Sequence, residues 1–198
     1  MSLDEFPDRL RRKFLIDERR HAASILANDF PEEFDDLCAC LDHFWLRRSY
    51  IEKSGGARSD VPKNIDGFLQ NERGGWRKHR FETSVVVDDQ PRAMPTHEID
   101  NLKNRIAVEV EWNNKTEFYD RDLNNFRLLF EFDVVSVGVI ITRLSELQDL
   151  FKELGRGDSY GASTTHWNKL LPKVDGGGAG GCPLLLIGMG LSCYDPDS

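Results

Sequence analysis

Three acidic residues, Asp100, Glu109 and Glu111, have the residue types and the spacing that could hold a metal ion. Apolar side chains alternate with the others over residues 106–112, which predicts a strand with both glutamates on one face. A short polar turn, expected over residues 101–104, would let Asp100 fold back beside Glu109. Two converging carboxylates suit a hard cation such as Mg²⁺, and a third could orient or deprotonate a water that the metal holds. The chemistry indicated is hydrolysis of a phosphodiester.

The alternative explanation is structural. Acidic residues that alternate along an edge strand commonly face solvent, and a short pattern of three acids also arises by chance. Features elsewhere in the sequence are needed to distinguish a metal site from solvent-facing acids.

Composition places the chain among ordinary globular proteins. Its 198 residues suffice for one domain with a core. No apolar run approaches the ~20 residues of a membrane-spanning helix, and residues 1–12 lack the apolar stretch of a signal peptide. These features predict a cytoplasmic protein with no membrane partner. The net charge of −8 argues against non-specific coating of nucleic acid, but a bound cation would offset the carboxylates of an enzyme acting on DNA.

The cysteines give no sign of a zinc site, because their spacing does not match one. We expect all four to be structural thiols in a reducing compartment. They are Cys38, Cys40, Cys182 and Cys193.

Hydrophobic periodicity predicts an α/β domain. The expected helices cover residues 8–27, 31–50, 62–73, 120–132 and 145–154, and the expected strands cover residues 81–87, 106–112, 134–142 and 183–189. The nearly continuous apolar run over 134–142 suits a central strand buried on both faces. The order predicts a single domain over residues 1–198 with a mixed central sheet flanked by helices. A helical N-terminal part would cover residues 1–58, and the core would cover residues 60–190.

Two further acids have a structural explanation. Asp120 and Asp122 would lie at the start of the helix expected over residues 120–132, where acidic side chains favour the helix dipole. On this interpretation neither belongs to the site.

Several segments, taken in order, resemble the BglII/BstYI group of type II restriction endonucleases. They are Gly-Trp-Arg-Lys at 75–78, Asp100, Asn-Arg-Ile-Ala-Val-Glu-Val-Glu at 104–111, Val-Ser-Val-Gly-Val-Ile-Ile at 135–141, Gly-Asp-Ser-Tyr at 157–160 and Cys-Pro-Leu-Leu-Leu-Ile-Gly-Met at 182–189. The resemblance covers about residues 60–190. It implies a restriction-endonuclease-like PD-(D/E)xK core, a homodimer, and dependence on Mg²⁺, with Mn²⁺ as a substitute. It also implies cleavage of a short palindromic duplex DNA sequence to leave 5′-phosphate ends, and a cognate DNA methyltransferase in a bacterial or archaeal host.

The resemblance also implies roles for individual residues. Asp100 and Glu109 would be metal ligands, together with the backbone carbonyl of Val110. Glu111 stands where this group often has Gln and where the wider superfamily often has Lys, so it could be a general base or could only orient water. Glu52 could be an additional acid near the metal, or an ordinary solvent-facing glutamate at a helix end.

Candidate DNA contacts lie in two segments. Asn113, Asn114 and Lys115 directly follow the catalytic strand, where an asparagine could pair with adenine and a lysine could contact a phosphate. Ser159 and Tyr160 lie in a loop rich in hydrogen-bond donors. The alternatives are an Asn-Asn turn, a solvated lysine and an ordinary exposed loop.

Two other functions on the same fold stay open. One is a structure-specific nuclease, and the other is a DNA-binding protein that has lost catalysis. The intact set of three acids argues against the second, because carboxylates alone repel phosphate. The recognition sequence is not predicted.

Overall fold

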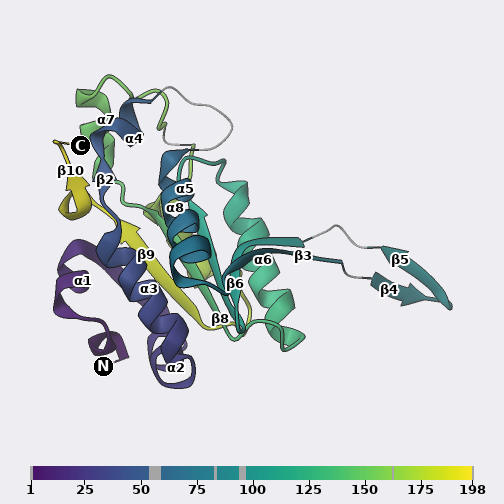
Figure 1. Cartoon of the computed structure of the whole chain (residues 1–198). Coiled ribbons are helices and arrows are strands. Elements are labelled where there is room, and N and C mark those ends of the chain that lie inside the picture. Colours follow the sequence, from purple (N-terminus) through teal and green to yellow (C-terminus); the bar gives the residue numbers. More distant parts are fainter. Residues whose placement is uncertain (1, 54–58, 83, 94–96, 162, 198) are drawn as a thin grey trace.

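A six-stranded mixed sheet lies at the centre of the molecule, between the helices (Figure 1). Its strand order is β1-β9-β8-β7-β6-β3. The computed structural model describes residues 2–53, 59–82, 84–93, 97–161 and 163–197. In sheet order the strands are β1 Phe14–Arg19, β9 Leu184–Met189, β8 Val137–Arg143, β7 Ile106–Glu111, β6 His97–Lys103 and β3 Arg77–Phe81. Strands β7, β8 and β9 are parallel, and β1, β6 and β3 pair antiparallel with their neighbours. The expected mixed α/β sheet is confirmed.

Helices cover both faces of this sheet. They are α1 Asp8–Lys13, α2 Ala22–Asp29, α3 Pro31–His43, α4 Arg48–Glu52, α5 Asp60–Gly67, a π-helical segment Phe68–Arg73, α6 Glu117–Glu131, α7 Leu147–Glu153 and α8 Trp167–Asp175. A short parallel pair joins β2 Leu46–Arg47 to β10 Tyr194–Asp195. A hairpin of β4 Ser84–Val87 and β5 Gln90–Ala93 extends beyond β3 and β6 (Figure 1). None of the helices described is long and apolar enough to cross a membrane.

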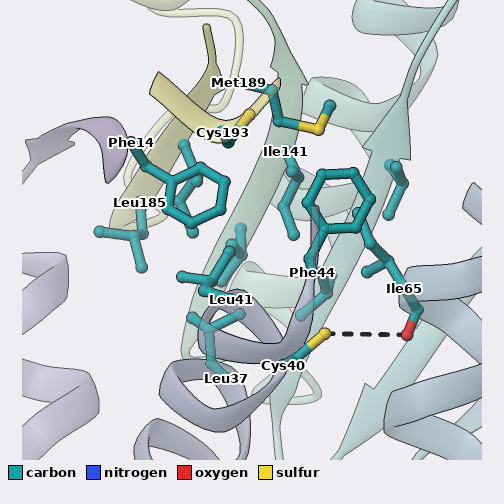
Figure 2. Packing of buried hydrophobic residues seen from close by; sticks show 14 of the residues in the cluster. Phe14, Leu37, Cys40, Leu41, Phe44, Ile65, Ile141, Leu185, Met189 and Cys193 are labelled. Carbon is teal, nitrogen blue, oxygen red and sulfur yellow. Dashed lines mark hydrogen bonds between the residues drawn. The ribbon is translucent and has the colours of Figure 1, made fainter. Parts of the chain in front are cut away.

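One face of the sheet packs against the N-terminal helices. Figure 2 shows Leu37 and Leu41 of α3 beside Ile141 and Leu185 of the central strands, in one buried apolar cluster. Burying each such side chain contributes about 1.5–3 kcal/mol relative to leaving it in water. The thiol of Cys40 also reaches the carbonyl of Ile65, at 3.9 Å, and so links α3 to α5. All four cysteines are buried and free.

The opposite face packs against α6 and α8 in a second apolar cluster. Gly138 of β8 brings α6 close, because a Cβ added there would come within 2.5 Å of the Phe126 ring. This close approach holds α6 directly over β8 and its neighbour β7. The position of α6 matters for the site described below.

Most of the predicted strands are confirmed, and the buried strand expected over residues 134–142 appears as β8, with every residue buried. The helices expected over 62–73 and 145–154 appear as α5 with its π-helical extension and as α7. The strand expected over residues 81–87 is split between β3 and β4. The acid-bearing β7 lies inside the sheet between β8 and β6, so the alternative of a solvent-facing edge strand is wrong.

Several predicted boundaries are wrong. The helix expected over residues 8–27 is interrupted by β1, which pairs with β9, and Arg20 and His21 then turn the chain with positive φ angles of 60° and 58°. The irregular spacing of apolar residues over 14–19 is compatible with a helix or a strand. The segment forms a strand because its backbone pairs with β9. The helix expected over residues 31–50 ends at His43. Helix α8, which contains Pro172, was not expected.

Candidate active site

The site lies where two neighbouring strands separate. The pairing of β6 with β7 ends at Asn101 and Val108, whereas the pairing of β7 with β8 continues to Glu111. Asp100 and Glu109 are therefore the first residues beyond the end of the β6–β7 ladder. The polar turn expected over 101–104 is shorter than predicted, because β6 continues to Lys103 and the chain turns at residues 104 and 105.

The pairing of β3 with β6 has an irregularity beside Asp100. Arg77 of β3 is opposite Leu102, but His79 is opposite Ile99, so β6 has one more residue than β3 between these pairs. Such a bulge bends a strand and redirects a side chain. The extra residue falls at Asp100 or Asn101, next to the acids of β7.

Glu109 and Glu111 are almost completely buried, with exposed fractions of 1% and 2%. They follow Ala107 at two-residue intervals, and Ala107 packs on the α6 side of the sheet. Both carboxyl groups therefore project from β7 towards α6.

Helix α6 supplies a fourth acid, Asp122, whose exposed fraction is 0%. The helix begins at Glu117, so Asp122 lies in its second turn. The helix-start explanation is therefore wrong for Asp122, although Asp120 does lie in the first turn, where it pairs with Lys173. Arg121 Nη2 lies 2.7 Å from Asp122 Oδ1 and 3.6 Å from Glu111 Oε1.

The crowding of these acids changes their titration. Burial, and then the charges of Asp122 and Asp100, raise the pKa of Glu109 well above its usual value. Burial and the neighbouring Asp122 raise the pKa of Glu111 to about 9. Burial also raises the pKa of Asp122. Because Glu111 keeps its proton at neutral pH, it does not repel the adjacent Asp122 carboxylate in the absence of a cation.

The loop after β7 closes one side of the site. Asn114 Nδ2 donates to Glu111 Oε2 over 2.8 Å, and the backbone N–H groups of Asn113 and Asn114 both donate to Thr165 Oγ1. A bridge between Lys115 and Thr164 continues this contact. The structure thus brings together two segments that are about fifty residues apart in the sequence.

The sequence-predicted DNA contacts differ in exposure. Lys115 and Ser159 are exposed, and Asn113 Nδ2 donates to the Ser159 carbonyl over 2.9 Å. Tyr160 is buried, and its ring stacks on Phe151 at a centroid separation of 4.1 Å. The Tyr160 ring is therefore part of the core.

Lys78 lies on β3, which pairs with β6 on the edge away from β7, and its side chain contacts Asp100. Its Nζ atom is 3.3 Å from Asp100 Oδ1 and 2.6 Å from Glu98 Oε1. A lysine cation thus occupies one face of the carboxylate that was predicted to hold a metal.

The remaining predicted residues have other surroundings. The Val110 side chain is buried in the apolar cluster under α3 and α5, so only its backbone faces the gap between β6 and β7. Glu52 lies at the end of α4, is exposed, and forms an ion pair with Arg48 at 2.7 Å. The structure does not bring Glu52 to the acids of β7.

Oxygen donors in the cluster match a hard divalent cation. Glu109 Oε1 and Asp122 Oδ2 are buried, and they accept no hydrogen bond from any residue described. Leaving a carboxyl oxygen buried and unpaired is costly, and Mg²⁺ prefers carboxylate and carbonyl oxygens. Within the described parts of the chain, no three His, Cys, Asp or Glu side chains already converge on one ion position. A cation would therefore require small side-chain movements, such as the release of Asp100 from Lys78.

The sequence analysis missed Asp122, Arg121 and Lys78. Asp122 was detectable only as one more acid in a helix, because its burial depends on how closely α6 packs on β8. Lys78 falls within the Gly-Trp-Arg-Lys segment at 75–78 but has no spacing signal towards Asp100.

Comparisons with known proteins identify the chain. The family model described as restriction endonuclease BglII/BglIII matches residues 14–189, from the first residue of β1 to the last residue of β9. A search of curated proteins found no match. The family match covers most of the chain and includes every acid of the site. The chain therefore belongs to the BglII/BglIII family of restriction endonucleases, which are phosphodiester hydrolases that act on DNA.

Proposed function

We propose that this protein is a Mg²⁺-dependent type II restriction endonuclease that cuts a short palindromic sequence in duplex DNA and leaves 5′-phosphate ends. Mn²⁺ would substitute for Mg²⁺. The observation that carries the proposal is the position of Glu109. It is a buried acid with an unsatisfied oxygen, beside Asp100 at the gap between β6 and β7, in a chain of this family.

Asp100 and Glu109 are the proposed metal ligands, together with the backbone carbonyl of Val110. When bound, Mg²⁺ supplies a Lewis acid for the scissile phosphate and lowers the pKa of a water molecule. Glu111 orients the attacking water, and Asn114 fixes the direction of the Glu111 carboxyl group through the 2.8 Å hydrogen bond. Arg121 offsets part of the negative charge that the buried acids accumulate.

Lys115 and Ser159 are the proposed phosphate and DNA contacts, because both are exposed beside the loop that holds Asn114. A palindromic target has two-fold symmetry, which a homodimer with one site in each subunit matches. We therefore propose that two copies act on one duplex. A cognate methyltransferase would protect the host DNA in the same cytoplasm.

The direct test is digestion of phage DNA by the purified protein with Mg²⁺, Mn²⁺, Ca²⁺ or EDTA. We expect discrete fragments with Mg²⁺ and Mn²⁺ and none with EDTA. Sequencing the fragment ends should give one symmetric sequence with 5′-phosphates. Random degradation, or cutting only at branched or damaged DNA, would point to a structure-specific nuclease. Binding in Ca²⁺ without any cutting in Mg²⁺ would indicate a DNA-binding protein without catalysis.

A further inference from the structure

We propose that Asp122 of α6 is a further carboxylate of the cation site, and that it holds the same divalent cation as Glu109, directly or through one water molecule. This inference rests on the proposed function above. It adds a ligand from a helix to a site predicted from strand residues alone.

The first observation is an unpaired oxygen. Arg121 directs both Nε and Nη2 at Asp122 Oδ1, at 2.8 and 2.7 Å, and Oδ2 accepts no hydrogen bond from the described residues. Asp122 is fully buried, so bulk solvent does not reach its carboxylate. A buried carboxylate oxygen without a donor is expensive unless a cation is its partner.

The second observation is a matching unpaired oxygen on β7. Glu109 Oε1 is also buried without a donor. Glu109 shares its face of β7 with Glu111, and Arg121 Nη2 lies 3.6 Å from Glu111 Oε1 and 2.7 Å from Asp122 Oδ1. Two unsatisfied carboxylate oxygens from different elements thus belong to one interior cluster. A single divalent cation would satisfy both oxygens.

A purely structural role for Asp122 explains less. An aspartate that only anchors Arg121 could do so near the surface, because 47% of the Arg121 side chain is exposed. Such an aspartate would also be expected to offer both oxygens to the guanidinium fork. Instead one oxygen takes both contacts with Arg121 and the other is left free for another partner.

Asp122 has little freedom to move away from the site. Phe126 lies one helical turn later, on the same face of α6, and it packs against Gly138 of β8. This contact fixes the height of α6 above the sheet. The Asp122 carboxylate is therefore held beside the acids of β7 whether or not a cation is bound.

The test compares Asp122→Asn with Asp120→Asn, an exposed aspartate of the same helix that pairs with Lys173. Ca²⁺ is titrated into each protein without DNA, and binding is followed by calorimetry and by the rise in melting temperature. We expect Asp122→Asn to bind Ca²⁺ about tenfold more weakly or worse, in the range seen when metal-site partners are removed. Asp120→Asn should bind like the wild type. Equal Ca²⁺ affinity in the wild type and Asp122→Asn would overturn the inference.

Arg121→Met keeps the test informative if Asp122→Asn folds poorly. A ligand role for Asp122 predicts Ca²⁺ affinity that is unchanged or tighter, because a competing cation is gone. An anchoring role predicts that Arg121→Met loses Ca²⁺ binding as Asp122→Asn does, which would refute the proposal. Failure of the wild type itself to bind Ca²⁺ and cut DNA would overturn the proposed function with it. Normal cleavage and Ca²⁺ binding by both the wild type and Asp122→Asn would overturn only the role of Asp122.

Discussion

The side-chain amide of Asn114 donates a hydrogen bond to Glu111 Oε2 over 2.8 Å, so the loop after β7 is joined to the last acid of that strand. The same loop is held from its other side by Thr165. Asn114 therefore has a role within the site that is separate from base recognition. This contact favours the ionised form of Glu111 against the effect of burial.

Asn114→Ala should slow cleavage of cognate and mismatched DNA by a similar factor. A hydrogen bond to a charged group contributes about 1.5–3 kcal/mol, which corresponds to a loss of roughly tenfold or more. Single-turnover rates on a cognate site and on single-mismatch sites measure the effect. The Lys115→Ala variant, which removes a proposed phosphate contact, is measured on the same DNA sites for comparison. If Asn114 instead reads an adenine, the cognate rate alone should fall, and discrimination should drop by about 1–3 kcal/mol.

Glu111→Gln should retain much of the activity, with a loss of less than about a hundredfold. Glutamine keeps an oxygen that can accept the Asn114 hydrogen bond and can still orient water. A positioned general base contributes about 10²–10⁴-fold, so a larger loss would show that Glu111 removes a proton. Single-turnover cleavage at saturating Mg²⁺ separates this effect from altered metal affinity.

Lys78→Met should strengthen Ca²⁺ binding in the absence of DNA. Lys78 Nζ lies 3.3 Å from Asp100 Oδ1 and competes with a cation for that carboxylate. Partly exposed ion pairs contribute about 0.2–1 kcal/mol, so we expect a change of up to about fivefold. Lys173→Met, which breaks the exposed pair with Asp120, is the control and should leave Ca²⁺ affinity unchanged. Weaker binding by Lys78→Met would mean that Lys78 supports the site instead of competing with the metal.

The metal-free protein should lose stability as pH rises. The folded state raises the pKa of Glu111 from 4.5 to about 9, because the residue is buried beside Asp122. Between these values the unfolded chain releases a proton that the folded chain keeps, so unfolding becomes more favourable. The stabilisation is complete below about pH 4.5 and is lost as pH rises through about 9.

Melting temperatures in EDTA from pH 5 to pH 9 measure this dependence. Glu111→Gln should show a shallower decline than the wild type, because glutamine does not titrate. Identical slopes for the two proteins would show that Glu111 has no raised pKa. Ca²⁺ should stabilise the wild type more at pH 8 than at pH 5, because binding requires ionised carboxylates.

The sequence predicts the parts of the fold that depend on local pattern. Period-two alternation identified β7, and a continuous apolar run identified β8 as a buried strand. Strand β1 was missed because its pairing with β9 joins residues at opposite ends of the chain, as with Phe14 and Met189. No local pattern contains that information.

The same limit applies to the site: the residues that are close in sequence could be predicted, and those that come together only through tertiary packing could not. Asp100, Glu109 and Glu111 lie within twelve residues of one another, so their spacing is visible in the sequence. Asp122 depends on the packing of Phe126 against Gly138, and Lys78 depends on the pairing of β3 with β6. Both are tertiary relationships, and neither leaves a spacing signal towards the three acids.

The measurement that bears most directly on the central claim is single-turnover cleavage by Glu109→Gln at saturating Mg²⁺, on the sequence that the wild type cuts. Asp100→Asn is measured in parallel, and Glu117→Gln, an exposed acid in the first turn of α6, is the control. Circular dichroism and DNA binding in Ca²⁺ confirm that each variant is folded. We predict no detectable cleavage by Glu109→Gln or Asp100→Asn, with DNA binding retained and Glu117→Gln fully active. Cleavage by Glu109→Gln at a rate near that of the wild type would contradict the assignment of this buried glutamate to the catalytic metal site.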